Sequence, residues 1–302
     1  MLNVTLLGTG GTMPLKNRWL SSCLLSSNGH SVLIDCGEGT QIALKAAGHK
    51  FKSIDVICIS HFHADHISGI PGFLLTMSNE GRTKPVTFIG PKGIEHNIRS
   101  LCVIAPNLPF DMSFIEYTDN MEFCLENMRI RAFPLKHSVR CMGFTLELLR
   151  VGKFDRDKAE KNNVPMRMWK LLQKNESAEL DGTVYTSDMV LGKPRKGIKV
   201  TYCTDTRPTE TIAENALGSE LFICEGMFGD NGKLARAKES GHMLFSEAAE
   251  LALRANVKQM WLTHFSPSLT DPEAYIDSAK KIYPSTECGY DGKTIDLMFD
   301  KE

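Results

Sequence analysis

Residues 54–66 read IDVICISHFHADH, an apolar run that ends at three histidines and an aspartate. The apolar part, residues 54–60, is rich in β-branched side chains and is typical of a strand that is buried on both faces. His61 and His63 would project to one side of an extended chain, whereas Asp65 and His66 require the chain to turn. The stretch therefore predicts a buried strand followed by a loop that wraps around one or two cations.

Further candidate ligands follow apolar runs elsewhere in the chain. His137 follows IRAFPLK, Asp205 follows KVTYCT, and His264 follows QMWLT. Ligand sites in α/β proteins form beyond the carboxyl ends of strands, so we expect these side chains to meet the HFHADH loop. A single histidine or aspartate in such a place is more often an ordinary hydrogen-bonded polar group. The recurrence of three such residues beside HFHADH favours a metal centre instead.

Five histidines and two aspartates suffice for two cations. The expected division places His61, His63 and His137 on one cation and Asp65, His66 and His264 on the other, with Asp205 bridging. Ligation by nitrogen and oxygen alone suits Zn²⁺, with Mn²⁺ and Fe²⁺ as alternatives. Two such ions about 3.5–4 Å apart lower the pKa of a bridging water and clamp the attacking and leaving oxygens. The pattern predicts a hydrolase of esters, amides or phosphodiesters.

Strand-like and helix-like runs alternate along the chain, which predicts an α/β layered fold. The expected strands are residues 4–7, 20–25, 32–34, 54–60, 86–90, 121–126, 128–135, 143–149, 199–203, 220–224 and 259–263. The expected helices are residues 38–48, 91–105, 209–217, 245–256 and 272–283, and a loop followed by a helix is expected within residues 63–81.

Composition narrows the class of protein. The chain has 302 residues and a net charge of −1, which argues against a protein that coats nucleic acid through bulk charge. Nine cysteines without C-x-x-C spacing give no support to a thiolate zinc cluster. The odd cysteine count and a start, MLNVTLLGTGG, without a basic leader predict a cytoplasmic protein.

Residues 149–199 stand apart from the remainder. This segment contains 12 Lys and Arg against seven Asp and Glu, so it carries a charge of +5 while the rest of the chain carries −6. Such polarisation indicates a basic patch for an anionic partner. A solvated insertion without a partner is an equally good interpretation of the charge alone.

The motifs resemble those of the metallo-β-lactamase superfamily and, within it, of the ribonuclease Z family, which processes tRNA 3′ ends. The matching stretches are LLGTGGTMP (6–14), SSCLL (21–25), LIDCGEGTQ (33–41), ISHFHADHISGIPG (59–72), FPLKHSVRCMGF (133–144), DTRP (205–208), Glu225 and GHM (241–243). The resemblance implies one domain over residues 1–302, a four-layer αβ/βα sandwich, with residues 149–199 inserted as a protruding arm. It also implies two Zn²⁺ ions and a homodimer.

The same resemblance implies a zinc-dependent endoribonuclease. It would cleave a tRNA precursor after the discriminator base by in-line attack of a metal-bridging hydroxide, leaving a tRNA 3′-hydroxyl. Asp65 would be both ligand and proton acceptor, and His242, oriented by Glu225, would protonate the departing oxygen. Without the resemblance, His242 and Glu225 would be interpreted as exposed polar residues.

The arm would grip the tRNA, and its positive charge suits phosphate contacts. Arg167, Trp169 and Lys170 are the candidate substrate-binding residues there, although a Met and Trp stripe in this segment is equally consistent with packing inside the arm.

Two other functions remain open. One is a small-molecule metallohydrolase of the same fold, such as a cyclic nucleotide phosphodiesterase, another phosphodiesterase or a lactonase. The other is a non-catalytic RNA-binding protein, which the presence of all seven ligands disfavours. Asp35, in LIDCGEGT, is expected either to anchor the metal loop from behind or to serve as a turn residue.

Overall fold

The computed structural model describes residues 1–118, 121–174 and 177–300. These residues form two compact units. The first contains residues 1–147 and 199–298, and the second contains residues 148–198 with residues 299–300 of the C-terminal end.

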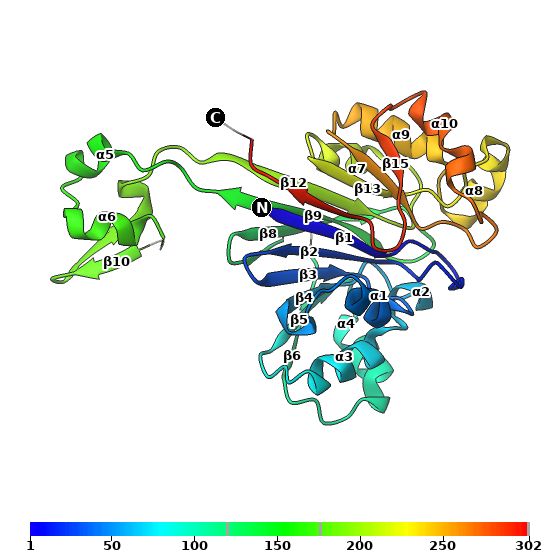
Figure 1. Cartoon of the computed structure of the whole chain (residues 1–302), viewed down its shortest axis with the longest axis horizontal. Helices are drawn as coiled ribbons and strands as arrows, with labels where there is room; N and C mark the ends of the chain where they lie inside the picture. The colour runs from blue at the N-terminus through cyan, green and yellow to red at the C-terminus, as the bar shows by residue number, and fades with distance from the viewer. Residues whose placement is uncertain (119–120, 175–176, 301–302) are drawn as a thin grey trace. The chain divides into compact units, whose positions relative to one another are not determined.

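The first unit is built on two seven-stranded sheets (Figure 1). The first sheet has the order β16-β1-β2-β3-β4-β5-β6, with bounds Thr294–Leu297, Leu2–Gly8, Ser22–Ser27, His30–Ile34, Ile54–Cys58, Val86–Gly90 and Met112–Glu116. The second has the order β15-β14-β13-β12-β9-β8-β7, with bounds Thr286–Cys288, Met260–Thr263, Leu221–Glu225, Arg195–Cys203, Cys141–Arg150, Met128–Leu135 and Glu122–Leu125.

Helices cover the outer face of each sheet, as Figure 1 shows. Helices α1 (Thr40–Ala46), α3 (Ile70–Asn79) and α4 (Ile94–Leu101) pack on the first sheet through a core that includes Leu44, Phe73 and Ile98. Helices α7 (Glu210–Ala216), α9 (Phe245–Arg254) and α10 (Asp277–Lys280) pack on the second through Ile212, Ala249 and Ala279. The predicted four-layer αβ/βα arrangement is confirmed.

The parallel strands set the position of the site. Strands β3, β4, β5 and β6 run parallel in the first sheet, and β12, β13, β14 and β15 run parallel in the second. The HFHADH loop leaves the carboxyl end of β4 and continues into the single turn α2 (Ala64–Ile67). Asp205 and His264 follow the carboxyl ends of β12 and β14. Loops at such ends are free of the hydrogen-bond ladder, so their side chains can converge on a ligand.

Two expected helices are shorter than predicted because glycines interrupt them. The helix expected over 38–48 begins after Gly39, whose φ of 90° lies in the left-handed region, and a Cβ there would meet the Trp19 ring at 2.2 Å. The helix expected over 91–105 begins after Gly93, whose φ is 91°, and ends in the 3₁₀ turn η2 (Cys102–Ile104). Residues 272–283 form the turn η5 (Glu273–Tyr275) and the short α10 rather than one helix.

The remaining short elements of the first unit connect these layers. They are the 3₁₀ turns η1 (Phe51–Ser53) and η4 (Asn231–Lys233) and the helix α8 (Leu234–Ser240), which precedes His242. Among the described residues, none of the helices is long and apolar enough to cross a membrane.

The second unit has a small core of its own. It contains α5 (Arg156–Lys161), α6 (Met166–Leu172), the hairpin β10 (Ser177–Leu180) and β11 (Thr183–Thr186), and the turn η3 (Ser187–Met189). Ala159, Met168 and Leu172 from the two helices are buried against Val190 and Leu191. The described residues of the basic segment therefore form a folded element.

We predict that Phe88→Ala lowers the free energy of unfolding by about 3–5 kcal/mol, because truncation of a buried ring leaves a cavity. Phe88 lies on β5 with no exposed surface and stacks at 5.4 Å on the Phe114 ring. Urea unfolding measures the change. Val103→Ala, at a residue that is 76% exposed, is the control and should shift it by less than about 0.5 kcal/mol. Equal effects of the two substitutions would contradict the assigned core.

Candidate metal centre

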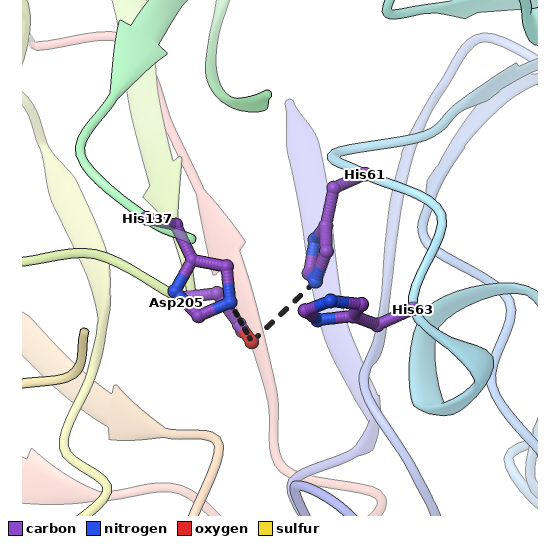
Figure 2. Close-up of side chains that lie close together, drawn as sticks. All are labelled: His61, His63, His137 and Asp205. Carbon is purple, nitrogen blue, oxygen red and sulfur yellow. Dashed lines mark ion pairs between the residues drawn. The ribbon is translucent and has the colours of Figure 1, made fainter. Parts of the chain in front are cut away.

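The seven predicted ligands meet at one place in the first unit. These seven fall into two groups whose candidate ligand atoms all lie within 4.8 Å of one another, and Glu225, His242 and His264 form a third group of this kind. The first is His61, His63, His137 and Asp205, and the second is Asp65, His66, Asp205 and His264. Figure 2 shows the first group, with the imidazoles of His61, His63 and His137 arranged around the Asp205 carboxylate.

Asp205 belongs to both groups because its two oxygens face different imidazoles. Oδ2 lies 3.5 Å from His61 Nε2 and 3.8 Å from His137 Nε2, the two contacts that are dashed in Figure 2. Oδ1 lies 3.2 Å from His66 Nε2 and 3.0 Å from His264 Nε2. Each oxygen of this carboxylate therefore faces a separate set of candidate ligands.

Two buried ring nitrogens without hydrogen-bond partners indicate whether a cation fits this cluster. Nε2 of His61 and Nε2 of His137 are buried and have no hydrogen-bond partner among the described residues. Leaving such an atom unpaired in the interior costs about 1–3 kcal/mol. Both atoms face the same carboxylate oxygen, so one divalent cation would satisfy all three. The cluster therefore fits the binding of divalent metal ions by nitrogen and oxygen donors.

Hydrogen bonds to the Nδ1 atoms, which face away from the cluster, orient two of the histidines. Asp35 Oδ2 lies 2.8 Å from His66 Nδ1 and accepts a hydrogen bond at 2.8 Å from the Ser60 hydroxyl. His137 Nδ1 lies 3.2 Å from the Gly241 carbonyl oxygen. With the ring proton on Nδ1, facing these acceptors, Nε2 of both histidines is left as the candidate ligand atom. Of the two interpretations of Asp35, the structure favours the anchor.

Three residues of the site, two aspartates and one histidine, have a strained backbone conformation. Asp35, Asp205 and His264 follow strand ends with φ of 58°, 45° and 57°, in the left-handed region that side chains other than glycine rarely adopt. Each such residue costs of order 1–3 kcal/mol, and such residues concentrate at functional sites. The sharp reversal turns each side chain from the strand end toward the cluster. Gly11 lies so close to the His264 ring that a Cβ there would meet it at 2.5 Å.

Beside the ligands lies a buried histidine–carboxylate pair. His242 Nδ1 is 3.2 Å from both oxygens of Glu225, which has no exposed surface. Glu225 also accepts hydrogen bonds from the backbone N–H groups of Thr206 at 2.5 Å and Met243 at 3.2 Å. Burial alone would lower the pKa of His242, but the charge and hydrogen bond of Glu225 outweigh burial and raise it. The pair therefore favours a protonated imidazole beside the ligands.

Arg207 connects the loop that carries Asp205 to the loop that carries His242. Its guanidinium donates to the His242 carbonyl oxygen and pairs with Glu247, and its backbone N–H donates to the Lys136 carbonyl at 2.9 Å. The neighbouring Thr206 hydroxyl accepts the Lys136 N–H at 3.0 Å. These contacts hold three loops of the site in one arrangement.

The arm residues belong to the second unit. Arg167 and Lys170 are exposed, and Arg167 forms an exposed ion pair with Asp181 at 2.8 Å. Trp169 is half-buried, because its indole N–H donates to the Val164 carbonyl at 2.8 Å and its ring lies 5.1 Å from that of Phe154. Packing within the arm therefore accounts for Trp169.

Comparison with known proteins identifies the class of fold. The protein family described as Anti-Pycsar protein Apyc1 matches residues 2–148, just under half of the chain. The metallo-β-lactamase fold protein YhfI from Bacillus subtilis has a TM-score of 0.70 at 17% identity, covering 97% of this chain and 98% of its own. The short form of human tRNase Z has a TM-score of 0.70 at 24% identity, covering 98% and 100%. The fold is therefore the metallo-β-lactamase fold.

Sequence similarity is more specific than the fold. Ribonuclease Z of Lachnospira eligens is 53% identical over 303 residues, which covers 100% of both chains. The chain belongs to the ribonuclease Z family, whose hydrolytic endoribonucleases are part of the metallo-β-lactamase superfamily.

Sequence reasoning missed several supporting residues. Ser60, Arg207 and the backbone N–H of Thr12, which donates to Asp65 Oδ2 at 2.7 Å, were not singled out. Arg207 lies in the DTRP motif, so its place two residues after a ligand was an available signal. A backbone donor leaves no trace in the sequence, since any residue carries one.

We predict that Asp35→Asn lowers metal affinity about 10–100-fold, because the amide no longer holds the His66 ring as the carboxylate does. Chelator competition followed by elemental analysis measures this affinity. Asp55→Asn, at an ion pair with Arg82 away from the cluster, is the matched control and should leave it unchanged. Unaltered affinity in the Asp35 variant would remove Asp35 from the support of the site.

We also predict that metal uptake releases protons. Burial opposes the protonation of both His264 and His66. Asp205 and Asp65 nevertheless raise the pKa of His264 to about 10 in the metal-free cluster, and Asp205 and Asp35 raise that of His66. Burial, with the positive charge of His66, lowers the pKa of His61 to about 2.

Both raised groups hold protons at neutral pH that a cation must displace, so affinity at the second group should fall as the pH falls below about 10. The first group should show little change. Calorimetry in buffers of different ionisation enthalpy counts the released protons. Uptake of both ions without proton release would contradict the assignment.

Proposed function

We propose that this protein is the endoribonuclease that removes the 3′ trailer from tRNA precursors. The observation that carries the proposal is the seven-residue cluster with the His242–Glu225 pair beside it, in a chain 53% identical along its whole length to a ribonuclease Z. We further propose that the protein acts in the cytoplasm as a homodimer. In this proposal residues 149–199 serve as the arm that grips the tRNA.

The proposed cofactor is a pair of Zn²⁺ ions. His61, His63 and His137 would hold one ion and Asp65, His66 and His264 the other, with Asp205 shared. Bound there, the ions would supply Lewis acidity, lowering the pKa of water and neutralising charge on the scissile phosphate.

Asp65 is the proposed acceptor of the water proton. Its Oδ2 is fixed by the Thr12 N–H at 2.7 Å and faces His264 Nε2 at 3.4 Å. Burial raises the pKa of Asp65, but the hydrogen bond from His264 and the charges of His66 and His264 outweigh burial, so the pKa lies below its ordinary value. The group is thus an ionised carboxylate at neutral pH, and its position beside the cluster, rather than its basicity, supports the role of acceptor.

His242 is the proposed donor to the leaving oxygen. Hydrolysis forms a phosphorus–oxygen bond to water and breaks the bond from phosphorus to the 3′-oxygen of the tRNA, which must take up a proton. Glu225 occupies His242 Nδ1, so Nε2 is the nitrogen free to donate. Loss of the proton leaves a neutral imidazole, which solvent protonates again.

The test of the function is incubation of the purified protein with a tRNA precursor, with and without a chelator, followed by mapping of both product ends. The expected products are a tRNA with a 3′-hydroxyl and a trailer with a 5′-phosphate. Hydrolysis of small phosphodiesters without cleavage of the precursor would instead support a small-molecule phosphodiesterase.

We predict that His242→Ala and His63→Ala both abolish most activity for different reasons. His242→Ala should lower kcat about 10²–10⁴-fold with metal content unchanged, because a positioned acid contributes that much. It should also remove the decline in rate of the wild type at pH values above the raised pKa of His242. His63→Ala should lose metal. Elemental analysis beside the pH profile separates them, and metal loss in the His242 variant would make His242 a ligand instead.

We predict that the double variant Arg167→Gln, Lys170→Gln weakens binding of precursor tRNA and makes it less dependent on salt. Each lost phosphate contact should reduce the slope of log affinity against log salt by about 0.7–0.9. The matched control is Arg156→Gln, which removes one exposed cation from α5. Filter binding at several salt concentrations measures the slope. An unchanged slope in the double variant would exclude these two side chains from the RNA contact.

A further inference from the structure

A cavity of about 310 Å³ opens beside His242 in the first unit. Its wall combines the apolar side chains of Met227 and Phe228 with the hydroxyls of Ser240 and Ser268, and Arg236 lies on it as well. Pockets that bind small organic groups begin at about 300 Å³ and combine apolar walls with a few polar groups. This cavity is therefore of a size for one nucleotide rather than for a length of RNA.

The position of His242 determines which nucleotide that would be. In the proposed reaction the atom that needs a proton is the 3′-oxygen of the last nucleotide kept on the tRNA, whereas the phosphate leaves with the trailer. A proton donor must lie within hydrogen-bond reach of the atom it protonates. His242 lines the cavity, so the ribose of the retained nucleotide has to lie at its mouth.

The walls match the parts of a nucleotide. Met227 and Phe228 are only 4% and 5% exposed, so the core holds them in place, and the small part of each that lines the cavity is an apolar wall against which a base can pack. Ser240 and Ser268 are exposed residues that line the cavity. The Ser240 hydroxyl donates to the Arg236 carbonyl oxygen and the Ser268 hydroxyl pairs with that of Ser266, both at 2.9 Å, and each oxygen can still accept a hydrogen bond from a ribose or a base edge. Serine hydroxyls both donate and accept, so they discriminate weakly among bases.

Arg236 supplies a positive charge at the wall of the cavity. It is exposed on α8, and its guanidinium carbon lies 5.8 Å from the centre of the Phe228 ring. Within the described part of the chain it has no ion pair with a carboxylate. An arginine held over an aromatic ring at the wall of a nucleotide-sized cavity is suited to a phosphate oxygen.

Resting on the proposed function, we infer that this cavity binds the last nucleotide retained on the tRNA, and that Arg236 contacts the phosphate on the 5′ side of that nucleotide. The trailer then leaves from the opposite side of the metal cluster. The cavity thus fixes the direction in which the RNA crosses the site, and it sets any preference for the retained base.

Two cycles of substrate and protein changes test the inference. In the first, Ser268→Trp fills the cavity, and the precursor is abasic either at the last retained nucleotide or at the first trailer nucleotide. The first abasic change should lower kcat/KM of the wild type about tenfold but cost less than twofold in Ser268→Trp, because the two changes remove the same contact. The second abasic change should cost both proteins the same.

In the second cycle, a neutral methylphosphonate replaces the phosphate on the 5′ side of the retained nucleotide. The wild type should lose about tenfold in kcat/KM and Arg236→Gln almost nothing further, since the charge pair is already absent. Lys238→Gln, on the same helix but outside the cavity, should behave as the wild type. Metal content and melting temperature verify that every variant is folded.

An undiminished abasic penalty at the retained nucleotide in Ser268→Trp overturns the inference, as does coupling to the trailer nucleotide in its place. An undiminished methylphosphonate penalty in Arg236→Gln overturns the role of Arg236. These outcomes differ from failure of the proposed function, in which the wild type itself would not cleave the precursor at the tRNA 3′ end.

Discussion

The Asp205 carboxylate is the group on which the architecture of the site depends. Each of its oxygens faces two imidazoles, one pair from each half of the cluster, and the side chain is almost fully buried. Burying so many polar and ionisable groups together is unfavourable unless each has a partner. Divalent cations would provide those partners, since the buried Nε2 atoms of His61 and His137 have none among the described residues. The site is therefore more complete with cations than without them.

The two-sheet frame makes this arrangement possible. Parallel strands in both sheets end on the same side, so loops from β4, β12 and β14 reach one point without long excursions. The cores beneath each sheet are closely packed, and rigid strands can sustain the left-handed backbone at Asp35, Asp205 and His264. The local strain is opposed by burial of apolar side chains elsewhere in the unit. This division of roles is the usual one between a stable scaffold and its functional loops.

The His242–Glu225 pair adds a candidate proton donor beside the cluster and so makes the site chemically asymmetric. The His242 ring lies 5.2 Å from that of His137 in the first group and 5.4 Å from that of His264 in the second, and the cavity adjoins it. Arg207 holds the His242 loop through a backbone carbonyl, so the pair is positioned by the same loop that carries Asp205. A substrate that crosses the site would therefore meet different chemistry at its two ends, as cleavage with a defined polarity requires.

Much of the candidate site and the fold class could be predicted from the sequence, because both depend on local sequence pattern. The histidine spacing in residues 61–66 and the apolar runs before His137, Asp205 and His264 predicted the residues that the structure brings into one cluster, and alternating strand-like and helix-like runs predicted the α/β class. Other features depend on contacts between distant residues, such as the pairing of β16 with β1 at the two ends of the chain. The sequence left Asp35 open between two roles and Trp169 between RNA contact and packing. Only the tertiary structure connected Asp35 to His66, Trp169 to Val164 and Phe154, and Arg207 to His242, because hydrogen bonds and close packing between residues far apart in the chain have no local signature.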